Sequence, residues 1–396
     1  MAVYAGMILG EIPGLALDRS GIALLGAIAI LASGRLTLED AWAAIDVHTL
    51  ALLFGLMVIS AQFRLGGFYT ETVRRIAARA GDARRLLLYV VLAAGVFSAV
   101  LANDIVCLAM APMLIEVCAR RHLQPVPFLI ALACASNIGS AATLIGNPQN
   151  MFIGETLRLS FAGYLVDGLP PALLGLAITW LIIDWQWRGR WGVVGEPPID
   201  RRQPRTFDRW QTAKGLAVLT VTVAAFLLTS WPRDVIALTA AGVLLLSRRM
   251  ASHEMIGLVD WHLLVLFIGL FVVNDAVDRA GIMKAVYAAL TTRGVDLTRP
   301  EWLFVVTPVL SNLISNVPAV MLLLPASSGP SAGAVLALAS TFAGNLLIVG
   351  SIANIIVVEE ARRRRVAIDW RMHARIGVPV TVLTLVTAAA WVWLRT

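Results

Sequence analysis

Apolar segments long enough to cross a lipid bilayer follow one another along almost the whole chain. Such segments have no water to bond their backbone within the membrane, so they can fold only as helices or as a closed barrel, and runs of this length favour helices. The composition agrees, because 59% of the 396 residues are hydrophobic and only 14% are charged. We therefore expect an all-α polytopic membrane protein. The predicted crossings are 2–17, 20–34, 46–63, 127–157, 163–185, 212–230, 233–247, 260–277, 333–358 and 376–394.

Two further apolar runs, 86–119 and 301–325, are interrupted midway by polar residues. We interpret each as a re-entrant hairpin that enters and leaves the membrane on the same face. With the N-terminus outside, ten crossings then place about three quarters of the 32 lysines and arginines inside, as the positive-inside rule expects. The prediction is a multi-pass protein of the cell (inner) membrane, with both termini outside and the basic linker 187–211 in the cytoplasm.

The two halves of the chain resemble each other. Residues 18–60 align with 232–274 without a gap, so that Arg19 pairs with Arg233. Each half has five crossings, and an odd number turns the second copy upside down in the membrane. Inverted repeats that each hold a discontinuous helix are typical of secondary transporters. The predicted organisation is a first repeat at 1–186 (hairpin 86–119, broken helix 127–157), a linker at 187–211, and a second repeat at 212–396 (hairpin 301–325, broken helix 333–358).

Polar, helix-breaking stretches occur at matched positions of the two repeats. Residues 98–104 align with 311–317, and 146–155 align with 350–359. Irregular backbone survives at membrane depth only where it lines a cavity or is buried in protein. One such break is more often a packed kink, whereas two at matched positions favour a binding site.

Amides and small residues dominate this candidate site. Both hairpin tips and both breaks would begin helices, so up to four helix N-termini would face one another and suit an anion without Lys or Arg. The candidate substrate-binding residues are Asn103, Asn137, Gly146, Asn147, Pro148, Asn150, Ser315, Asn316, Asn345, Gly350, Ser351 and Asn354.

Asp104 is the only carboxylate at either hairpin tip, and Val317 takes its place in the second repeat. A charge at that depth is costly and is by default functional. We predict that Asp104 couples transport, either as a proton carrier or as a cation ligand. The alternative is a structural carboxylate that caps the following helix. No cofactor is expected, and the coupling ion is H⁺ or Na⁺.

Other chemically capable residues are expected to be structural. Glu155 and Glu359 are interpreted as interfacial charges, and His48 and His262 as matched residues at the membrane boundary. The three cysteines are expected to pack between helices, with an As(III)–thiolate site as the alternative.

Four motifs carry a family resemblance. They are NDIVCLAMAPM, NIGSAATLIGNPQN, SNVPAVMLLLP and GNLLIVGSIANIIVVEEA. Together they resemble the ion transporter superfamily, which includes arsenite permeases, citrate-type permeases, divalent anion:sodium symporters and one family of sodium/proton antiporters. The closest likeness is to the arsenite-permease-like "anion transporter" branch. The resemblance implies an elevator-type carrier, usually dimeric, with a scaffold domain and a moving transport domain.

One departure from the family pattern bears on coupling. Sodium-coupled dicarboxylate members carry Ser-Asn-Thr at both tips, whereas this chain has Ala-Asn-Asp at 102–104 and Ser-Asn-Val at 315–317. The leading hypothesis is a proton-coupled secondary transporter of a small anion or an arsenite-like oxyacid. A sodium/proton-type cation antiporter that uses Asp104 is the alternative.

A polytopic membrane enzyme is the hypothesis of another class. It is disfavoured, because the sequence holds no metal-ligand spacing, P-loop, nucleotide fingerprint or nucleophile–base pair. The expected partners are a small-molecule or ion substrate, the lipid bilayer and a second copy of the chain. Nucleic acid is not expected, because the basic residues fall in short tracts between apolar segments.

Overall fold

The computed structural model describes residues 2–9, 17–192 and 206–395, and this part of the chain is helical without strands. The predicted all-α class is therefore confirmed. The first half contains α1 (Ala2–Leu9), α2 (Arg19–Ala32), α3 (Leu38–Ala44), α4 (Val47–Leu65), α5 (Phe68–Arg79), α6 (Ala83–Val100), α7 (Asn103–Arg120), α8 (Pro125–Ser140), α9 (Pro148–Thr156) and α10 (Phe161–Trp187). The second half contains α11 (Arg209–Leu228), α12 (Arg233–Leu245), α13 (Ser252–Ile256), α14 (Trp261–Arg279), α15 (Ile282–Thr291), α16 (Pro300–Ile314), α17 (Asn316–Leu323), η1 (Leu324–Ala326), α18 (Ala332–Ala343), η2 (Ile348–Gly350), α19 (Ile352–Arg363) and α20 (Trp370–Arg395).

Within the described residues, six helices are long and apolar enough to cross a membrane: α4, α6, α10, α11, α14 and α20. The sequence predicts ten full crossings, and the difference has a physical reason. Helices α2 and α12 have only 14 and 13 residues, which at 1.5 Å per residue is about 20 Å, short of a core of about 30 Å. Conversely, α6 has the length of a full span although it was expected as one leg of a hairpin. The predicted crossing 2–17 extends into 10–16, outside the described residues.

Helices from the two halves pack against each other in two equivalent crossings. Helix α4 packs on α12, and α14 packs on α2. A Cβ atom at Gly55 of α4 would lie 2.6 Å from the carbonyl carbon of Ala237, and one at Gly269 of α14 would lie 2.7 Å from that of Ala23. These residues are matched pairs in the repeat alignment. The internal repeat seen in the sequence is thus reproduced in three dimensions.

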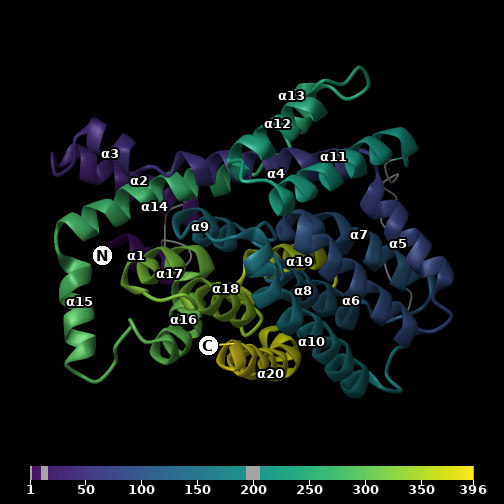
Figure 1. Cartoon of the computed structure of the whole chain (residues 1–396). Helices are drawn as coiled ribbons and strands as arrows, with labels where there is room; N and C mark the ends of the chain where they lie inside the picture. The colour runs from purple at the N-terminus through teal and green to yellow at the C-terminus, as the bar shows by residue number, and fades with distance from the viewer. Residues whose placement is uncertain (1, 10–16, 193–205, 396) are drawn as a thin grey trace.

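The predicted hairpins and broken helices form the buried centre. Helices α6 and α7 pack together and meet at 101–102, and α16 and α17 do so at Ser315. The first broken helix consists of α8 and α9, and the second of α18 and α19. Every residue of α8 and of α18 is buried, and α19 packs on both α7 and α8. Figure 1 shows α8, α18 and α19 in the middle of the molecule, between α15 at one edge and α5 at the opposite edge.

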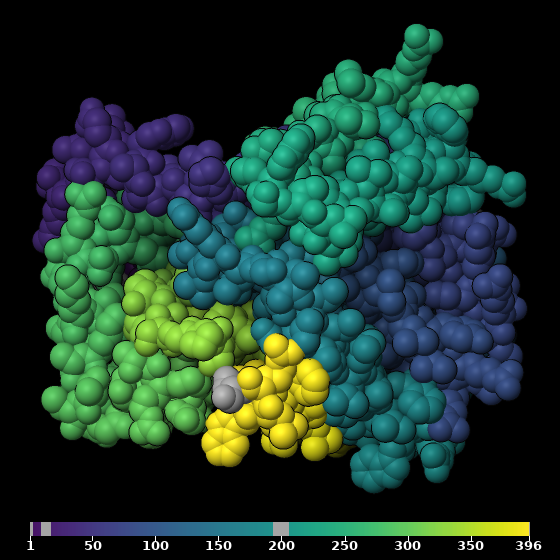
Figure 2. All heavy atoms as spheres, viewed as in Figure 1, coloured from purple at the N-terminus to yellow at the C-terminus, as the bar shows by residue number. Residues whose placement is uncertain are grey.

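The remaining elements surround this centre. Helix α20 packs against α10, and its yellow atoms lie between the green second half and the teal α10 in Figure 2. The short helices α3, α5, α13 and α15 were not expected from the sequence, because none is long enough to cross a membrane. The repeat boundaries at 187–211 stay a prediction, and residues 193–205 of that linker lie outside the described part of the chain.

Candidate functional site

Each broken helix restarts at a side-chain cap. Asn147 accepts a hydrogen bond from the backbone nitrogen of Asn150 at 2.9 Å and so caps α9. Ser351 accepts one from the nitrogen of Ala353 at 3.2 Å and caps α19. Pro148 occupies the first turn of α9, where its missing N–H costs no hydrogen bond. The Gly-Asn-Pro stretch is therefore a helix start inside the protein.

Asn150 and Asn354 close the two breaks in the same way. The side-chain nitrogen of Asn150 donates to the carbonyls of Ser140 at 3.4 Å and Thr143 at 3.0 Å. That of Asn354 donates to the two matched carbonyls at 2.7 and 3.0 Å. Both amides thus satisfy carbonyls freed where α8 and α18 end. Their nitrogens are committed to the fold, and only the oxygen of Asn150 is left unpaired.

Asn137 joins the two repeats at the centre of the cluster. Its nitrogen donates to the side-chain oxygens of Asn345 at 2.9 Å and Asn354 at 3.1 Å. Its oxygen accepts from the hydroxyl of Ser351 at 2.8 Å. The carbonyls of the break fix which side-chain atom of Asn354 is the nitrogen. The oxygen of Asn354 must then accept from Asn137, and this fixes the amide orientations of Asn137 and Asn345 as well. Asn345 is fully buried and keeps an unpaired nitrogen.

Thr341 belongs to this cluster although the sequence analysis did not single it out. Its hydroxyl accepts from the side-chain nitrogens of Asn147 and Gln149, both at 3.2 Å. Continuing the alignment of the breaks toward the N-terminus pairs Thr341 with Asn137. The bond from Asn147 to Thr341 therefore mirrors the bond from Ser351 to Asn137. That alignment offset was the signal that could have identified Thr341.

The first hairpin tip docks onto the first break. The backbone nitrogen of Asn103 donates to the carbonyl of Gly146 at 3.4 Å, and its side chain donates to Asn137 at 3.5 Å. The hydroxyl of Ser136 donates back to the Asn103 carbonyl at 3.1 Å. Gly146 has no room for a side chain, because a Cβ atom would lie 2.3 Å from the carbonyl oxygen of Ser140.

The second tip docks in the matching place and is strained. Ser315 has φ 78° and ψ 161°, a region that costs a residue with a side chain about 1–3 kcal/mol. Asn316 follows Ser315. Its amide satisfies the hydrogen-bonding groups around it when the side-chain nitrogen donates to the carbonyls of Gly350 at 3.2 Å and Ser340 at 3.1 Å. In this orientation its oxygen accepts from Gln149 at 3.3 Å. Such strain persists only where the surrounding structure imposes it.

Asp104 is half-buried at the first tip and makes no hydrogen bond or ion pair with any described residue. The N-cap of α7 is Ala102, so Asp104 is not the capping carboxylate considered as its structural alternative. It lines a cavity of about 20 Å³ together with Pro148 of α9 and Asp260 at the start of α14. A carboxylate from the hairpin therefore faces one from the long helix α14.

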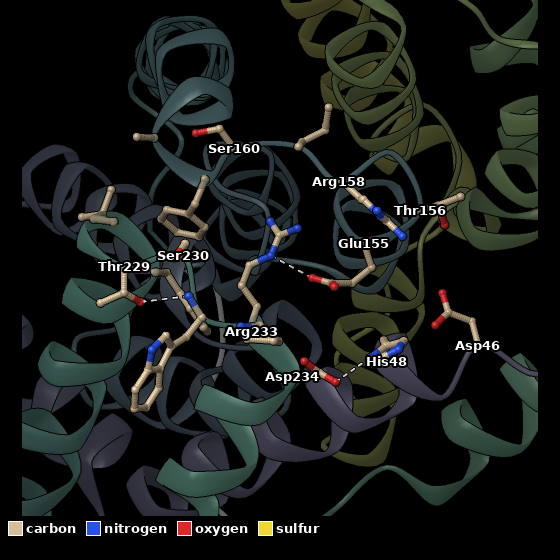
Figure 3. Close-up of a pocket in the computed structure, with 17 residues that line it drawn as sticks. Asp46, His48, Glu155, Thr156, Arg158, Ser160, Thr229, Ser230, Arg233 and Asp234 are labelled. Carbon is tan, nitrogen blue, oxygen red and sulfur yellow. Dashed lines mark hydrogen bonds and ion pairs between the residues drawn. The ribbon is translucent and has the colours of Figure 1, made fainter.

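Two larger cavities are built from matched residues. The first, of about 800 Å³, is lined by Asp46, His48 and Arg233, which Figure 3 shows around it. The second, of about 540 Å³, is lined by the counterparts of these residues, Asp260, His262 and Arg19. Only the second of the two includes a hairpin tip, through Ser315 and Val317. The second tip thus opens to a wide space, whereas Asp104 at the first tip faces the narrow one.

Comparison with known proteins identifies the family. The profile described as "Citrate transporter" matches residues 4–343. The chain belongs to the citrate transporter family. The inner membrane protein YbiR of Escherichia coli is 31% identical over 335 residues, which cover 84% of each chain. A silicon efflux transporter of rice (Oryza sativa subsp. japonica) is 29% identical over 450 residues, covering 94% of this chain and 92% of the rice protein.

A solved structure shares the fold. The crystal structure of the Alcanivorax borkumensis YdaH transporter, described as having an unusual topology, aligns with a TM-score of 0.62 at 15% identity. The alignment covers 96% of this chain and 89% of that one. The structural likeness supports the fold, and the family profile together with the named relatives confirms the resemblance to the ion transporter superfamily. This protein is a multi-pass membrane transporter.

The transporter brings most of the predicted site residues into one hydrogen-bonded cluster. The hydroxyl of Ser140 links the groups described above, because it accepts from the side-chain nitrogen of Asn147 at 2.9 Å and donates to the carbonyl of Asn137 at 2.7 Å. The cluster thus contains Asn103, Asn137, Asn147, Asn150, Asn316, Asn345, Ser351 and Asn354, and Gly146 and Gly350 supply carbonyls. Pro148 and Ser315 shape the backbone beside it. Their role in binding a substrate stays a prediction.

Two of the residues expected to be structural, Glu155 and His48, make specific contacts in the transporter. Glu155 pairs with Arg233 at 2.8 Å, and His48 lies 2.6 Å from Asp234, as the dashed lines of Figure 3 show. Glu359 is exposed. The three cysteines are buried and unpaired, and no group of three or more His, Cys, Asp or Glu residues in the described part of the chain could hold a metal ion.

Proposed function

We propose that this protein is a secondary active transporter of the elevator type, whose substrate binds among the buried amides between the two broken helices. One observation carries the proposal: both hairpin tips and both helix breaks converge on a single buried cluster that contains polar atoms without partners. Unpaired buried polar groups are costly and are rare in proteins without a functional reason. A ligand that supplies the missing bonds gives such a reason.

The unpaired atoms indicate what kind of ligand fits. Asn103, Asn150 and Asn312 each keep a buried side-chain oxygen without a partner, and Asn345 keeps a nitrogen. Hydroxyl groups both donate and accept, so a small polyhydroxyl acid can satisfy such a set better than a fully ionised anion. Arsenous and silicic acids have this chemistry and are neutral near pH 7. The name of the rice relative, a silicon efflux transporter, supports this choice.

A small inorganic or organic anion is the second candidate substrate. Helices α7, α9, α17 and α19 all begin beside the cluster, and helix N-termini carry partial positive charge that attracts anions. No Lys or Arg occurs in 136–157 or 343–354, which leaves the helix termini as the source of positive potential there.

Access to the cluster is proposed to alternate between the two faces of the membrane. The second tip opens into the cavity of about 540 Å³, whereas the first tip faces one of about 20 Å³. Arg19 lines the wider cavity and begins α2, at an end of the helix that the distribution of basic residues assigns to the cytoplasm. We therefore interpret this conformation as open to the cytoplasm, in an inner membrane, with both termini outside. The homodimer follows from the family resemblance alone.

Asp104 is proposed to couple transport to a proton gradient. It is half-buried, has no hydrogen-bond or ion-pair partner among the described residues, and lies on the hairpin that would move. A carboxylate that exchanges a proton between the two faces would drive the substrate against its gradient. Cation/proton antiport through the same residue is the alternative, in which the ion itself is the cargo.

Uptake into proteoliposomes tests this function. Arsenite, silicic acid, phosphate, sulfate, citrate and succinate are compared, each with a pH gradient, a Na⁺ gradient or neither. We expect arsenite or silicic acid uptake that a pH gradient accelerates. Asp104→Asn should abolish the dependence on the gradient, while Glu39→Gln, an exposed carboxylate replaced in the same way, should leave it intact. Uptake no faster than into protein-free liposomes for every substrate would exclude the proposal.

A further inference from the structure

Two matched arginines make unlike contacts. Arg233 begins α12; its Nε lies 2.8 Å from a carboxylate oxygen of Glu155, and its Nη2 donates to the carbonyl of Gly154 at 2.7 Å. Figure 3 shows this pair beside the larger cavity. Arg19 begins α2 at the matching position, yet among the described residues its one hydrogen bond goes to the carbonyl of Val349 at 3.4 Å. Arg233 thus holds the C-terminal end of α9, whereas Arg19 contacts η2, in the break before α19.

The partners for a matching contact are both present but are not joined. In the repeat alignment Glu359 is the counterpart of Glu155, and Ile145 is the counterpart of Val349. Glu359 is exposed and forms no hydrogen bond or ion pair with any described residue. Within the part of the chain that the structure describes, Arg19 keeps a buried guanidinium nitrogen, Nη1, without a partner. The second repeat therefore contains the same two charges as the first, held apart.

The pair that is formed is expensive to break. The side chains of Arg233 and Glu155 are only 13% and 15% exposed, and separating a partly buried ion pair leaves charges that are poorly solvated. A carrier must nevertheless visit both of its states, so their free energies can differ by only a few kcal/mol. An equivalent pair that forms as the first one breaks keeps the two states close in energy.

We propose that Arg19, at the start of α2, and Arg233, at the start of α12, act as alternating latches that hold the two broken helices. In the opposite state Arg19 binds Glu359, while Arg233 leaves Glu155 and donates to the carbonyl of Ile145. This inference rests on the proposed alternation of access, because in an inverted repeat each half adopts in one state the contacts that the other half makes in the other. The two arginines are positioning residues and do not touch the substrate.

The surroundings of the two arginines are matched in the same way. Asp46 and His48 line the cavity beside Arg233, and their counterparts Asp260 and His262 line the cavity beside Arg19. Arg19 therefore already lies in the setting that surrounds the closed latch of the other half. The contact that is missing there is the one with Glu359 of α19, which is exposed.

Cross-linking in proteoliposomes tests the latch. The variant Arg19→Cys/Glu359→Cys is treated with a short bifunctional maleimide, since the Cα atoms of an Arg–Glu pair lie farther apart than a disulfide can span. We expect the cross-link to accumulate over time, because an irreversible reaction traps even a minor state. Arg233→Cys/Glu155→Cys should link rapidly. The mismatched variants Arg19→Cys/Glu155→Cys and Arg233→Cys/Glu359→Cys should not link; the native cysteines are buried.

A milder pair of variants keeps the test valid if the cysteine variants fold poorly. Glu359→Gln removes a contact only in the opposite state, whereas Glu155→Gln removes one only in the present state. Each should shift the ratio of the two states about fivefold, in opposite directions. The reporter is Ile348→Cys, which lines the cavity of about 540 Å³, labelled with a membrane-impermeant thiol reagent. Glu155→Gln should slow its labelling, and Glu359→Gln should not.

The results separate the latch from the proposed function. Cross-linking of both matched pairs, in a protein that moves none of the substrates tested, upholds the latch and rejects the substrate assignment. Transport in a protein where only Arg233→Cys/Glu155→Cys links, and where both glutamine variants label alike, overturns the latch and leaves the transport function standing.

Discussion

At the scale of single residues, the cluster depends most on Asn137, because its side chain joins the first broken helix to the second. Three partners depend on it: Asn345, Ser351 and Asn354. All three are buried. Its loss therefore affects the second repeat although the residue lies in the first.

Asn137→Ala should lower the free energy of unfolding by about 1–3 kcal/mol, because it leaves buried polar groups unpaired, and it should abolish transport. Thermal unfolding of the purified protein in detergent measures the first effect. Asn274→Ala is the control: this residue lies outside the cluster and bonds only to Tyr4 among the described residues, so its replacement should cost less. An Asn137→Ala variant as stable as the parent would contradict the central role of this amide.

Gly146→Ala should destabilise the protein more strongly than its one extra carbon suggests. The added Cβ would lie 2.3 Å from the Ser140 carbonyl oxygen and 2.6 Å from that of Ser98, so the backbone must move. Gly242→Ala is the matched control, since nothing lies within 4 Å of its new Cβ and Ala favours a helix over Gly by about 1 kcal/mol. Melting temperatures should fall for the first variant and hold or rise for the second.

The sequence alone predicted most members of the cluster, because amides beside Gly and Pro in an apolar run are costly in a helix that faces lipid. It missed Thr341, whose hydroxyl is ordinary in a helix and becomes informative only once α18 packs beside the first break. It also did not anticipate that Asn150 and Asn354 would use their nitrogens to hold the breaks closed.

At the scale of elements, the helices of the centre end and restart within a few residues of the polar stretches, because Pro, Gly and Asn mark where a membrane helix stops and restarts. That 86–119 and 301–325 re-enter the same face of the membrane stays a prediction. Helices α5 and α15 were not predicted. They follow matched glycines with positive φ, Gly67 and Gly281, and are too short to give a membrane-span signal. Their charged residues looked like loop charges in the sequence.

Helix α5 should respond to pH through Glu71. Arg74 and Arg75 donate to its carboxylate at 2.8 and 2.7 Å. The hydrogen bond from Arg74 has the larger effect, and together the two lower the pKa of Glu71 below its ordinary value. Because the folded-state pKa lies below the unfolded one, the stabilisation is present above the ordinary Glu pKa of about 4.3 and is lost as pH falls through the lowered value. Glu71→Gln should therefore melt earlier than the parent at pH 7, and the gap should narrow in acid. A gap that stays constant with pH would contradict this role.

At the scale of the whole molecule, the internal repeat relates the two halves of the structure. It accounts for the equivalent crossings of α4 with α12 and of α14 with α2, and it relates the helix caps and the amide-to-carbonyl bonds of the two breaks. The number of full crossings was harder to predict, because α2 and α12 are apolar enough to resemble spans but too short to be complete ones. The substrate was harder still, since amides and backbone groups select ligands by geometry, which no residue type encodes.

The most direct test of alternating access is whether the two hairpin tips are reached from opposite faces of the membrane. Single cysteines at the matched positions Ala102 and Ser315 are labelled with a membrane-impermeant thiol reagent in right-side-out and inside-out vesicles. We predict that Ser315→Cys is labelled from the face of the cavity of about 540 Å³, assigned to the cytoplasm. Ala102→Cys, which lines the cavity of about 20 Å³, should be labelled from the opposite face when the carrier visits its other state, and therefore more slowly. Labelling of both cysteines from the same face would contradict alternating access.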